Sequence, residues 1–212
     1  MRLAHQIVLA TLNHDKLLEF KALFSSQPEI ELISAEEVIR NASKINTVEV
    51  HSTLLENAVA KARLANQASH YPSLADDSGL EVEALNGRPG VHTHRYATPK
   101  TGVTQDQANI EKLLLELRGH QMANRKAKFV TCLALVMEGI LLHSTGILEG
   151  TIAEAPRGEN GFGYDPIFIP QGSDRTLAEM TEEEKNAISH RARALQELMQ
   201  KIKSKGIILA KP

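Results

Sequence analysis

Two hydrophobic patterns alternate along the chain. Short continuous apolar runs are typical of buried strands, and longer stretches with apolar residues at helical spacing are typical of amphipathic helices. Residues 25–48 follow neither pattern clearly. The apolar runs and alternating segments predict strands over 7–10, 80–84, 129–137, 140–152 and 167–169. The helical spacing and composition predict helices over 16–24, 54–67, 104–117 and 176–203.

Polar residues predict where three of these helices begin. Asn13 is a plausible N-cap of the first helix, because a short polar side chain can accept a free backbone N–H. Thr53 and Glu56 fit a capping box for the second helix. Thr104 caps the third, and Gly119 lies just beyond its end. The strand, turn and helix around Asn13 also place free N–H groups where an anion binds well.

The last helical stretch is expected to break between Lys185 and His190. On one straight helix these side chains would point about 140° apart, at ~100° per residue. If both serve one ligand, the helix must end and restart between them. Ser189 is a suitable N-cap for the second part. The sequence therefore predicts two helices here.

Composition and charge exclude some classes of protein. The 212 residues suit one large domain or one domain with two lobes. The net charge is -2 and the basic residues are scattered, which argues against a nucleic-acid binder with a broad basic face. The single cysteine, Cys132, permits no disulfide within the chain and fits a reducing compartment. The apolar run 7–10 is too short for a signal peptide, and no run reaches transmembrane length. These features predict a cytoplasmic protein that binds no membrane.

The run Asp76-Asp77-Ser78-Gly79 stands where one apolar segment stops and an alternating one begins. Two adjacent carboxylates repel each other, and Mg²⁺ would relieve the repulsion because it binds through one or two carboxylates, water and phosphates. The alternative is a turn, since Asp, Ser and Gly favour turns. Asp76 in particular could simply cap such a turn.

A glycine-rich loop over 157–166 carries two of the chain's eight Phe and Tyr residues. Its glycines, among them Gly161 and Gly163, permit close approach of the backbone to a ligand. Phe162 and Tyr164 offer aromatic faces on which a nucleobase can stack.

Together these features supply acids for a metal, cations for phosphates and an aromatic ring for a base. Taken singly, Lys16 could be a solvated helix lysine and His190 a core or capping residue. As a set they predict a site for a Mg²⁺–nucleoside triphosphate. The candidates are Thr11, Asn13, Lys16, Glu49, Lys61, Asp76, Asp77, Ser78, Phe162, Asp165, Lys185, His190 and Arg191.

Five segments resemble the inosine triphosphate pyrophosphatase family, and they run in the family's order over nearly the whole chain. The last three are highly specific. The segments are 8–16, 55–63, 75–80, 161–166 and 184–191.

The resemblance implies a fold and an activity. The fold is α/β, an elongated mixed β-sheet with flanking helices, with residues 1–212 as one domain of two lobes and the active site in the cleft between them. The activity is hydrolysis of XTP, ITP and dITP to the monophosphate and pyrophosphate, which removes these purine nucleotides from the pool. It implies Mg²⁺ as cofactor and a homodimer.

The resemblance also implies roles for residues. Asp77 would be the general base and a metal ligand, Glu49 a metal ligand by its offset from Glu56, and Asp76 would orient the site or bind the metal. Leu12 and His94 stand where the family usually has small residues. The substrate contacts that it implies are Thr11, Leu12, Asn13, His14, Asp15, Lys16, Lys61, Ser78, Phe162, Gly163, Tyr164, Asp165, Lys185, His190 and Arg191.

Three other functions are compatible with parts of the pattern. A regulatory module that binds nucleotides without turnover would need the basic residues and Phe162 but not Asp77 or Glu49. A diphosphatase acting on modified pyrimidines is disfavoured by the segment 189–191. A structural oligomer would not require adjacent carboxylates. The sequence therefore favours the purine enzyme.

Overall fold

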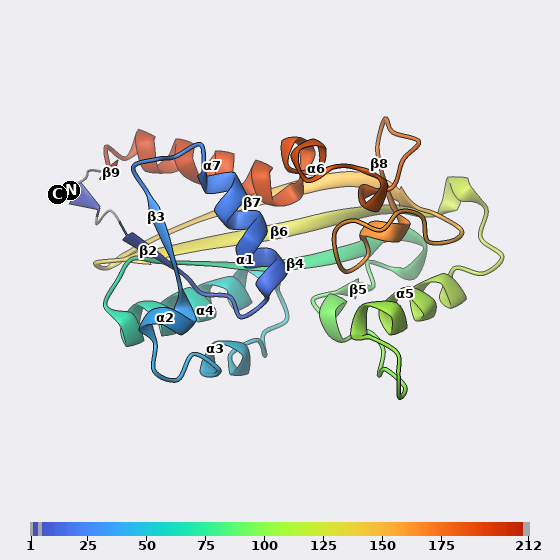
Figure 1. Ribbon diagram of the computed structural model, residues 1–212, viewed down its shortest axis with the longest axis horizontal. Coiled ribbons are helices and arrows are strands. Elements are labelled where there is room, and N and C mark those ends of the chain that lie inside the picture. The colour runs from blue at the N-terminus through green and yellow to red at the C-terminus, as the bar shows by residue number, and fades with distance from the viewer. Residues whose placement is uncertain (1, 4–5, 210–212) are drawn as a thin grey trace. The chain divides into compact units, whose positions relative to one another are not determined.

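The computed structural model describes residues 2–3 and 6–209, which include a mixed seven-stranded sheet (Figure 1). The strand order is β3-β2-β4-β6-β7-β8, with β5 paired to β4. Strand β2 is parallel to β3 and β4, whereas the β4–β5 and β7–β8 pairs are antiparallel. A second, two-stranded sheet pairs β1 with β9 in parallel. The strands are β1 Arg2–Leu3, β2 Gln6–Leu9, β3 Glu31–Ser34, β4 Ser73–Val82, β5 Pro89–Gly90, β6 Lys126–Met137, β7 Ile140–Ile152, β8 Phe168–Pro170 and β9 Ile208–Leu209.

Helices flank this sheet, which confirms the α/β class with a mixed sheet. Within residues 2–3 and 6–209, no helix is both long and apolar enough to span a membrane. The α-helices are α1 His14–Phe24, α2 Ala35–Val38, α3 Lys44–Thr47, α4 Leu54–Ser69, α5 Gln105–Glu116, α6 Glu182–Ile188 and α7 His190–Ser204. Short 3₁₀ helices are η1 Glu83–Leu85, η2 Thr93–Arg95, η3 Met122–Asn124, η4 Asp165–Ile167 and η5 Leu177–Glu179.

The chain divides into two compact units. Unit 1 comprises Met1–Asp77, Thr131–Gly146 and Arg191–Pro212, and unit 2 comprises Ser78–Val130 and Ile147–His190. Each unit has its own hydrophobic core. The expected organisation of residues 1–212 as one domain stays a prediction.

In unit 1, helices cover the strands on both faces. Figure 1 shows α7 above and α4 below these strands. Phe20 of α1 and Leu198 of α7 are buried in one core with Leu74 of β4. The opposite helix, α4, buries Ala58 and Ala62, whose small side chains allow a helix to lie close to the sheet. Polar side chains from helices on both faces can therefore reach β4.

In unit 2, α5 and the neighbouring strands enclose the second core. Leu113 of α5 and Leu80 of β4 are fully buried there. The rings of Phe129 and Phe168 pack with their centroids 4.5 Å apart. This core fixes the position of α5, and a residue in the first turn of α5 contacts the candidate site.

Several predicted helix ends are confirmed. The side chain of Asn13 accepts the N–H of Lys16, and Thr104 completes a capping box with Gln107. Thr53 caps α4, although the Glu56 carboxylate accepts from the Thr53 hydroxyl instead of the backbone N–H of a capping box. These caps are local contacts, which explains why the sequence reveals them.

The expected break before His190 is confirmed. Helix α6 ends at Ile188, Ser189 is extended with ψ 153°, and α7 begins at His190. The role of Ser189 as N-cap of α7 stays a prediction.

The expectation of a strand end or turn at Asp76-Asp77-Ser78-Gly79 is wrong. All four residues lie inside β4, a continuous strand of 10 residues. Helical residues donate to both carboxylates, Lys16 to Asp76 and Asn57 and Lys61 to Asp77, within the unbroken strand. The strand expected over 80–84 is the end of β4, which stops at Val82, and η1 begins at Glu83.

Candidate active site

The two adjacent carboxylates of β4 have different partners. Successive side chains of a strand point to opposite faces of the sheet. Asp76 accepts a hydrogen bond from Lys16 of α1, and Asp77 accepts from Asn57 and Lys61 of α4. Each carboxylate is thus stabilised on its own face.

Asp77 and Glu49 converge on one ammonium group. Lys61 Nζ lies 2.7 Å from Glu49 Oε1 and 3.2 Å from Asp77 Oδ1. The other oxygen of Asp77, Oδ2, accepts from Asn57 Nδ2 at 3.0 Å. Asn57 and Lys61 are four residues apart and share one face of α4. That face therefore holds both oxygens of Asp77.

Asn57 also forms a hydrogen bond with the segment that carries Glu49. Its Oδ1 accepts the backbone N–H of His51 at 3.0 Å, and its side chain is almost fully buried. Sequence reasoning did not include Asn57 among the site residues. Its helical spacing from Lys61 was the signal that could have found it.

Burial shapes the electrostatics of this group. Burial raises the pKa of the Asp77 carboxyl above its usual value, and Glu49 and Asp76 add to the rise, while Lys61 and Lys16 oppose it. Burial alone would lower the pKa of Lys61, but Asp77, Asp76 and Glu49 together raise it. The cluster thus favours a charged lysine among its acids.

The donor set fits a hard divalent cation. Glu49 and Asp77 already place two carboxylate oxygens within reach of one positive charge. Mg²⁺ commonly binds one or two carboxylates and keeps water and phosphate oxygens as its other ligands. Within residues 2–3 and 6–209, no three His, Cys, Asp or Glu side chains gather as a complete metal site. These residues suit an ion that shares its ligands with a substrate.

On the other face of β4, four charged side chains form a network, and all but Lys16 are buried. Lys16 Nζ lies 2.8 Å from Asp76 Oδ2, and Arg191 Nε lies 3.8 Å from the same oxygen. Arg191 NH1 donates to Glu19 Oε2 at 2.9 Å. Negative and positive charges alternate along this network. Sequence reasoning missed Glu19, although a glutamate three positions after Lys16 in a largely apolar helix was a usable signal.

Asp76 is held as a carboxylate. Its side chain is fully buried, and burial alone would raise its pKa. Lys16, Lys61 and Arg191 together outweigh that effect and hold the pKa far below its usual value. Asp76 is therefore ionised at neutral pH and acts as counter-ion to the cations around it.

Two side chains cap the turn that leads into α1, next to Lys16. Thr11 Oγ1 accepts from the N–H of Asn13 at 3.2 Å, and Asn13 Oδ1 accepts from the N–H of Lys16 at 2.9 Å. Leu12 is half-buried and contributes backbone here, while His14 and Asp15 are exposed. The expected substrate contacts over 11–16 thus form one short turn.

In unit 2, the glycine-rich loop closes on a buried ion pair. Lys185 Nζ donates to Asp165 Oδ2 at 2.7 Å and lies 4.6 Å from the centroid of the Phe162 ring. Asp165 Oδ2 also accepts the N–H of Phe162 at 3.0 Å. Gly161 has φ +73°, and a Cβ there would overlap the Asp165 carboxylate. The loop therefore requires glycine at this position.

Three further predicted positions belong to unit 2. Tyr164 is buried and donates from its hydroxyl to the carbonyl of Thr93 at 3.0 Å. His190 is buried and stacks on Phe129, with centroids 4.8 Å apart and an interplanar angle of 10°. Ser78 is half-buried in β4. That these residues serve the same ligand as the residues of unit 1 stays a prediction.

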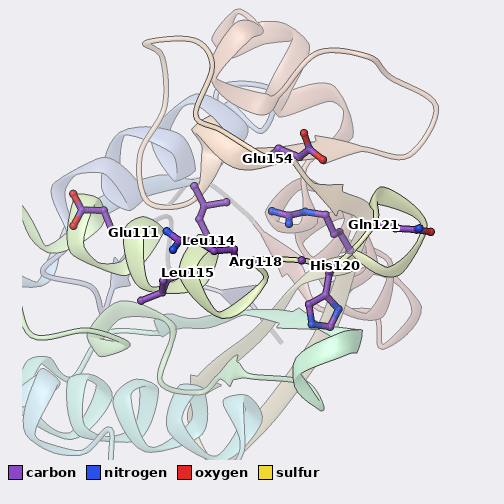
Figure 2. A pocket seen from close by; sticks show the side chains of 9 residues that line it. Glu111, Leu114, Leu115, Arg118, His120, Gln121 and Glu154 are labelled. Carbon is purple, nitrogen blue, oxygen red and sulfur yellow. The ribbon is translucent and has the colours of Figure 1, made fainter.

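A hollow of about 720 Å³ lies beside the end of α5, away from these residues (Figure 2). Leu115 is exposed on its wall. Arg125, also on the wall, is buried and donates to the carbonyls of Leu117, Ile152 and Ala153. The lining includes none of the predicted site residues.

Comparisons with known proteins match this chain to one family in sequence and fold. A model of the Ham1 family matches residues 7–201. A dITP/XTP pyrophosphatase of Geobacillus kaustophilus is 45% identical over 91% of this chain and 92% of that protein. A dITP/XTP pyrophosphatase of Bacillus subtilis is 43% identical over 93% of this chain and 97% of that protein.

Solved structures agree as well. A HAM1 protein from Coxiella burnetii superposes with a TM-score of 0.78 at 41% identity, covering 94% of this chain and 98% of that one. The Staphylococcus aureus Ham1 protein gives a TM-score of 0.77 at 37% identity, covering 94% of this chain and 99% of that one. With sequence and fold matched over nearly its whole length, this chain belongs to the Ham1 family.

Proposed function

We propose that this protein is a Mg²⁺-dependent nucleoside triphosphate diphosphatase that hydrolyses XTP, ITP and dITP to the monophosphate and pyrophosphate. The observation that carries the proposal is the convergence of Glu49 and Asp77 on one positive charge. The names of the curated relatives, dITP/XTP pyrophosphatase, support the same activity. Its role would be to remove deaminated purine nucleotides from the pool.

Asp77 is the proposed general base. A carboxylate within reach of a water molecule can take its proton as the water attacks the α-phosphorus, and such general bases contribute roughly 10²- to 10⁴-fold in rate. Burial raises the pKa of Asp77, which makes it a better proton acceptor than an exposed aspartate. Asn57 and Lys61 fix its two oxygens, so that the carboxylate is oriented in advance.

Glu49 and Asp77 would hold the Mg²⁺. When bound, the ion would neutralise charge on the phosphates and lower the pKa of a bound water. Asp76 has the alternative role of orienting the site. Because its Oδ2 already accepts from Lys16, we assign it to positioning that cation.

The phosphates would be bound by cations and by backbone N–H groups. Lys16, Lys61, Lys185 and Arg191 offset the negative charge, and the guanidinium of Arg191 suits bidentate contact with phosphate. The first turn of α1 adds N–H donors at a helix N-terminus. Ion pairs with buried carboxylates hold the charged groups of Lys16 and Arg191 in place before a ligand arrives.

The base would stack on Phe162, which is half-buried in the glycine-rich loop, and Arg191 is a candidate base contact. A donor facing the purine 6-position accepts a 6-oxo group and mismatches the 6-amino group of adenine. Mismatch of a buried polar group can discriminate by ~10⁴-fold.

We further propose that the protein is a cytoplasmic homodimer.

A product analysis tests the proposal. ITP, XTP, dITP, GTP, ATP and a modified pyrimidine triphosphate are each incubated with the protein and Mg²⁺, and the products are separated by anion-exchange chromatography. We expect monophosphate and pyrophosphate from the first three, little product from the others, and none when EDTA replaces Mg²⁺. Binding of ITP without turnover would instead favour the regulatory module.

A further inference from the structure

We propose that Asp106, in the first turn of α5, is a positioning residue for purine recognition. Its carboxylate fixes the backbone of the glycine-rich loop 157–166, and thereby the ring of Phe162. The inference rests on the proposed function, which assigns the base to Phe162. It adds a residue that acts through the loop and does not itself touch the substrate.

The contact that carries the inference joins residues far apart in the sequence. Asp106 Oδ2 accepts the backbone N–H of Gly163 at 2.8 Å, across 57 positions. Gly163 has φ +62°, a conformation that glycine adopts without strain. Hydrogen bonds to an ionised acceptor are shorter and stronger than neutral ones. The bond therefore fixes the residue that directly follows Phe162.

The loop is held at three consecutive residues by different partners. The N–H of Phe162 donates to Asp165 Oδ2 at 3.0 Å. The hydroxyl of Tyr164 donates to the carbonyl of Thr93 at 3.0 Å. Asp106 holds the residue between them and connects the loop to α5. Together these bonds define the backbone from which the Phe162 ring projects.

Asp106 is not needed to begin its helix. The capping box of Thr104 and Gln107 already satisfies the start of α5. Further along α5, Ile110 and Leu113 are buried in the core of unit 2. Because α5 is packed firmly in this core, the Asp106 carboxylate can hold the loop in one position. Binding sites are positioned most precisely when they are built on rigid elements.

Loss of this bond should weaken recognition of the base and leave the phosphate end unchanged. Removing a hydrogen bond to a charged group changes an equilibrium by roughly tenfold or more. We therefore expect Asp106→Ala to raise KM for ITP about tenfold with kcat nearly unchanged. Asp106→Asn retains an acceptor oxygen and should restore most of the affinity. A general loss of structure would lower kcat and would not be rescued by asparagine.

The experiment uses two ligands that separate the base from the phosphates. Calorimetry gives Kd for IMP and for inorganic tripolyphosphate with wild type, Asp106→Ala, Asp106→Asn and Glu111→Ala, an exposed acid of the same helix as control. We expect Asp106→Ala to bind IMP about tenfold more weakly and tripolyphosphate normally. The control should bind both as wild type does.

Three results would overturn the inference. If Asp106→Ala binds IMP as wild type does and wild type hydrolyses ITP, Asp106 has no positioning role and the proposed function stands. Equal weakening towards IMP and tripolyphosphate would mean that Asp106 acts on the whole site. If wild type neither binds IMP nor hydrolyses ITP, the proposed function fails, and the inference fails with it.

Discussion

Asp76 and Asp77 are neighbours in β4, yet their carboxylates bind cations from helices on opposite faces of the strand. Asp76 accepts from Lys16 of α1, and Asp77 accepts from Lys61 of α4. The pleat of the strand separates the two groups. One carboxylate is fully buried as a counter-ion, and the other stands beside Glu49. We therefore expect Asp76 to serve mainly the stability of the fold and Asp77 mainly the chemistry of the site.

Asp76→Asn should destabilise the protein strongly. The change leaves the half-buried Lys16 and the buried Arg191 without their shared anion, and breaking a buried ion pair costs about 3–5 kcal/mol of unfolding free energy. Urea unfolding at neutral pH measures the loss. Asp174→Asn, a change at an exposed side chain, is the control and should be close to neutral.

The same variant has a characteristic pH dependence. The folded state lowers the pKa of Asp76, so its carboxylate contributes stability above the unfolded carboxyl pKa of about 4 and loses it as the pH falls towards the lower folded-state pKa. The difference between wild type and Asp76→Asn should be constant near neutral pH and shrink in acid. A difference that grows in acid would contradict the ionised state assigned to Asp76.

The Glu19–Arg191 pair makes a second stability prediction. Glu19→Ala leaves a buried guanidinium without its carboxylate and should cost about 3–5 kcal/mol. Glu19→Met with Arg191→Met replaces both charges by apolar groups and should recover part of that loss, although Asp76 then keeps only Lys16 close by. Denaturant unfolding of the single and double variants gives the coupling energy. Additive effects would show that the two residues do not stabilise each other.

Glycine at position 161 should matter for the site as well as for the backbone. Gly161→Ala places a methyl group against the Asp165 carboxylate, which holds both Phe162 and Lys185. We expect KM for ITP to rise roughly tenfold, because a displaced loop loses a charge-assisted hydrogen bond.

Gly172→Ala is the matched control for this change. Gly172 has φ +84°, and a Cβ there would meet no atom within 4 Å. Both variants carry the cost of a left-handed backbone, about 1–2 kcal/mol. KM for ITP should stay normal in the control, and an equal rise in both variants would contradict a specific role for Gly161.

Local signals made the helix ends predictable. Asn13, Thr53 and Thr104 each bond to a backbone N–H three positions ahead, so the contact lies within the sequence pattern itself. The turn at Glu138 and Gly139 is local too, and both residues have positive φ as a two-residue hairpin turn requires. Residues 25–48 gave no clear pattern because β3 is a short edge strand and α2 and α3 are helices of four residues each.

Long-range partners were not predictable in the same way. Asp76-Asp77 looked like a strand end because Lys16 lies 60 positions away and Asn57 lies 20 away, and no local pattern records such pairs. Asp106 was missed for the same reason, since it acts on a residue 57 positions away. Glu19 and Asn57 were missed although their helical positions relative to Lys16 and Lys61 offered a signal. The resemblance to a family supplied the candidate ligand contacts, and the structure added the residues that hold them.

The role of Asp77 as general base is tested most directly by measuring pyrophosphate release from ITP for wild type, Asp77→Asn and Asp76→Asn. The melting temperature of each protein is measured alongside. We expect Asp77→Asn to keep its melting temperature and its affinity for IMP but to lose roughly 100-fold or more in kcat. Asp76→Asn should instead lower the melting temperature, because it removes a buried counter-ion. Wild-type turnover by a folded Asp77→Asn would contradict the account and move the base to another residue.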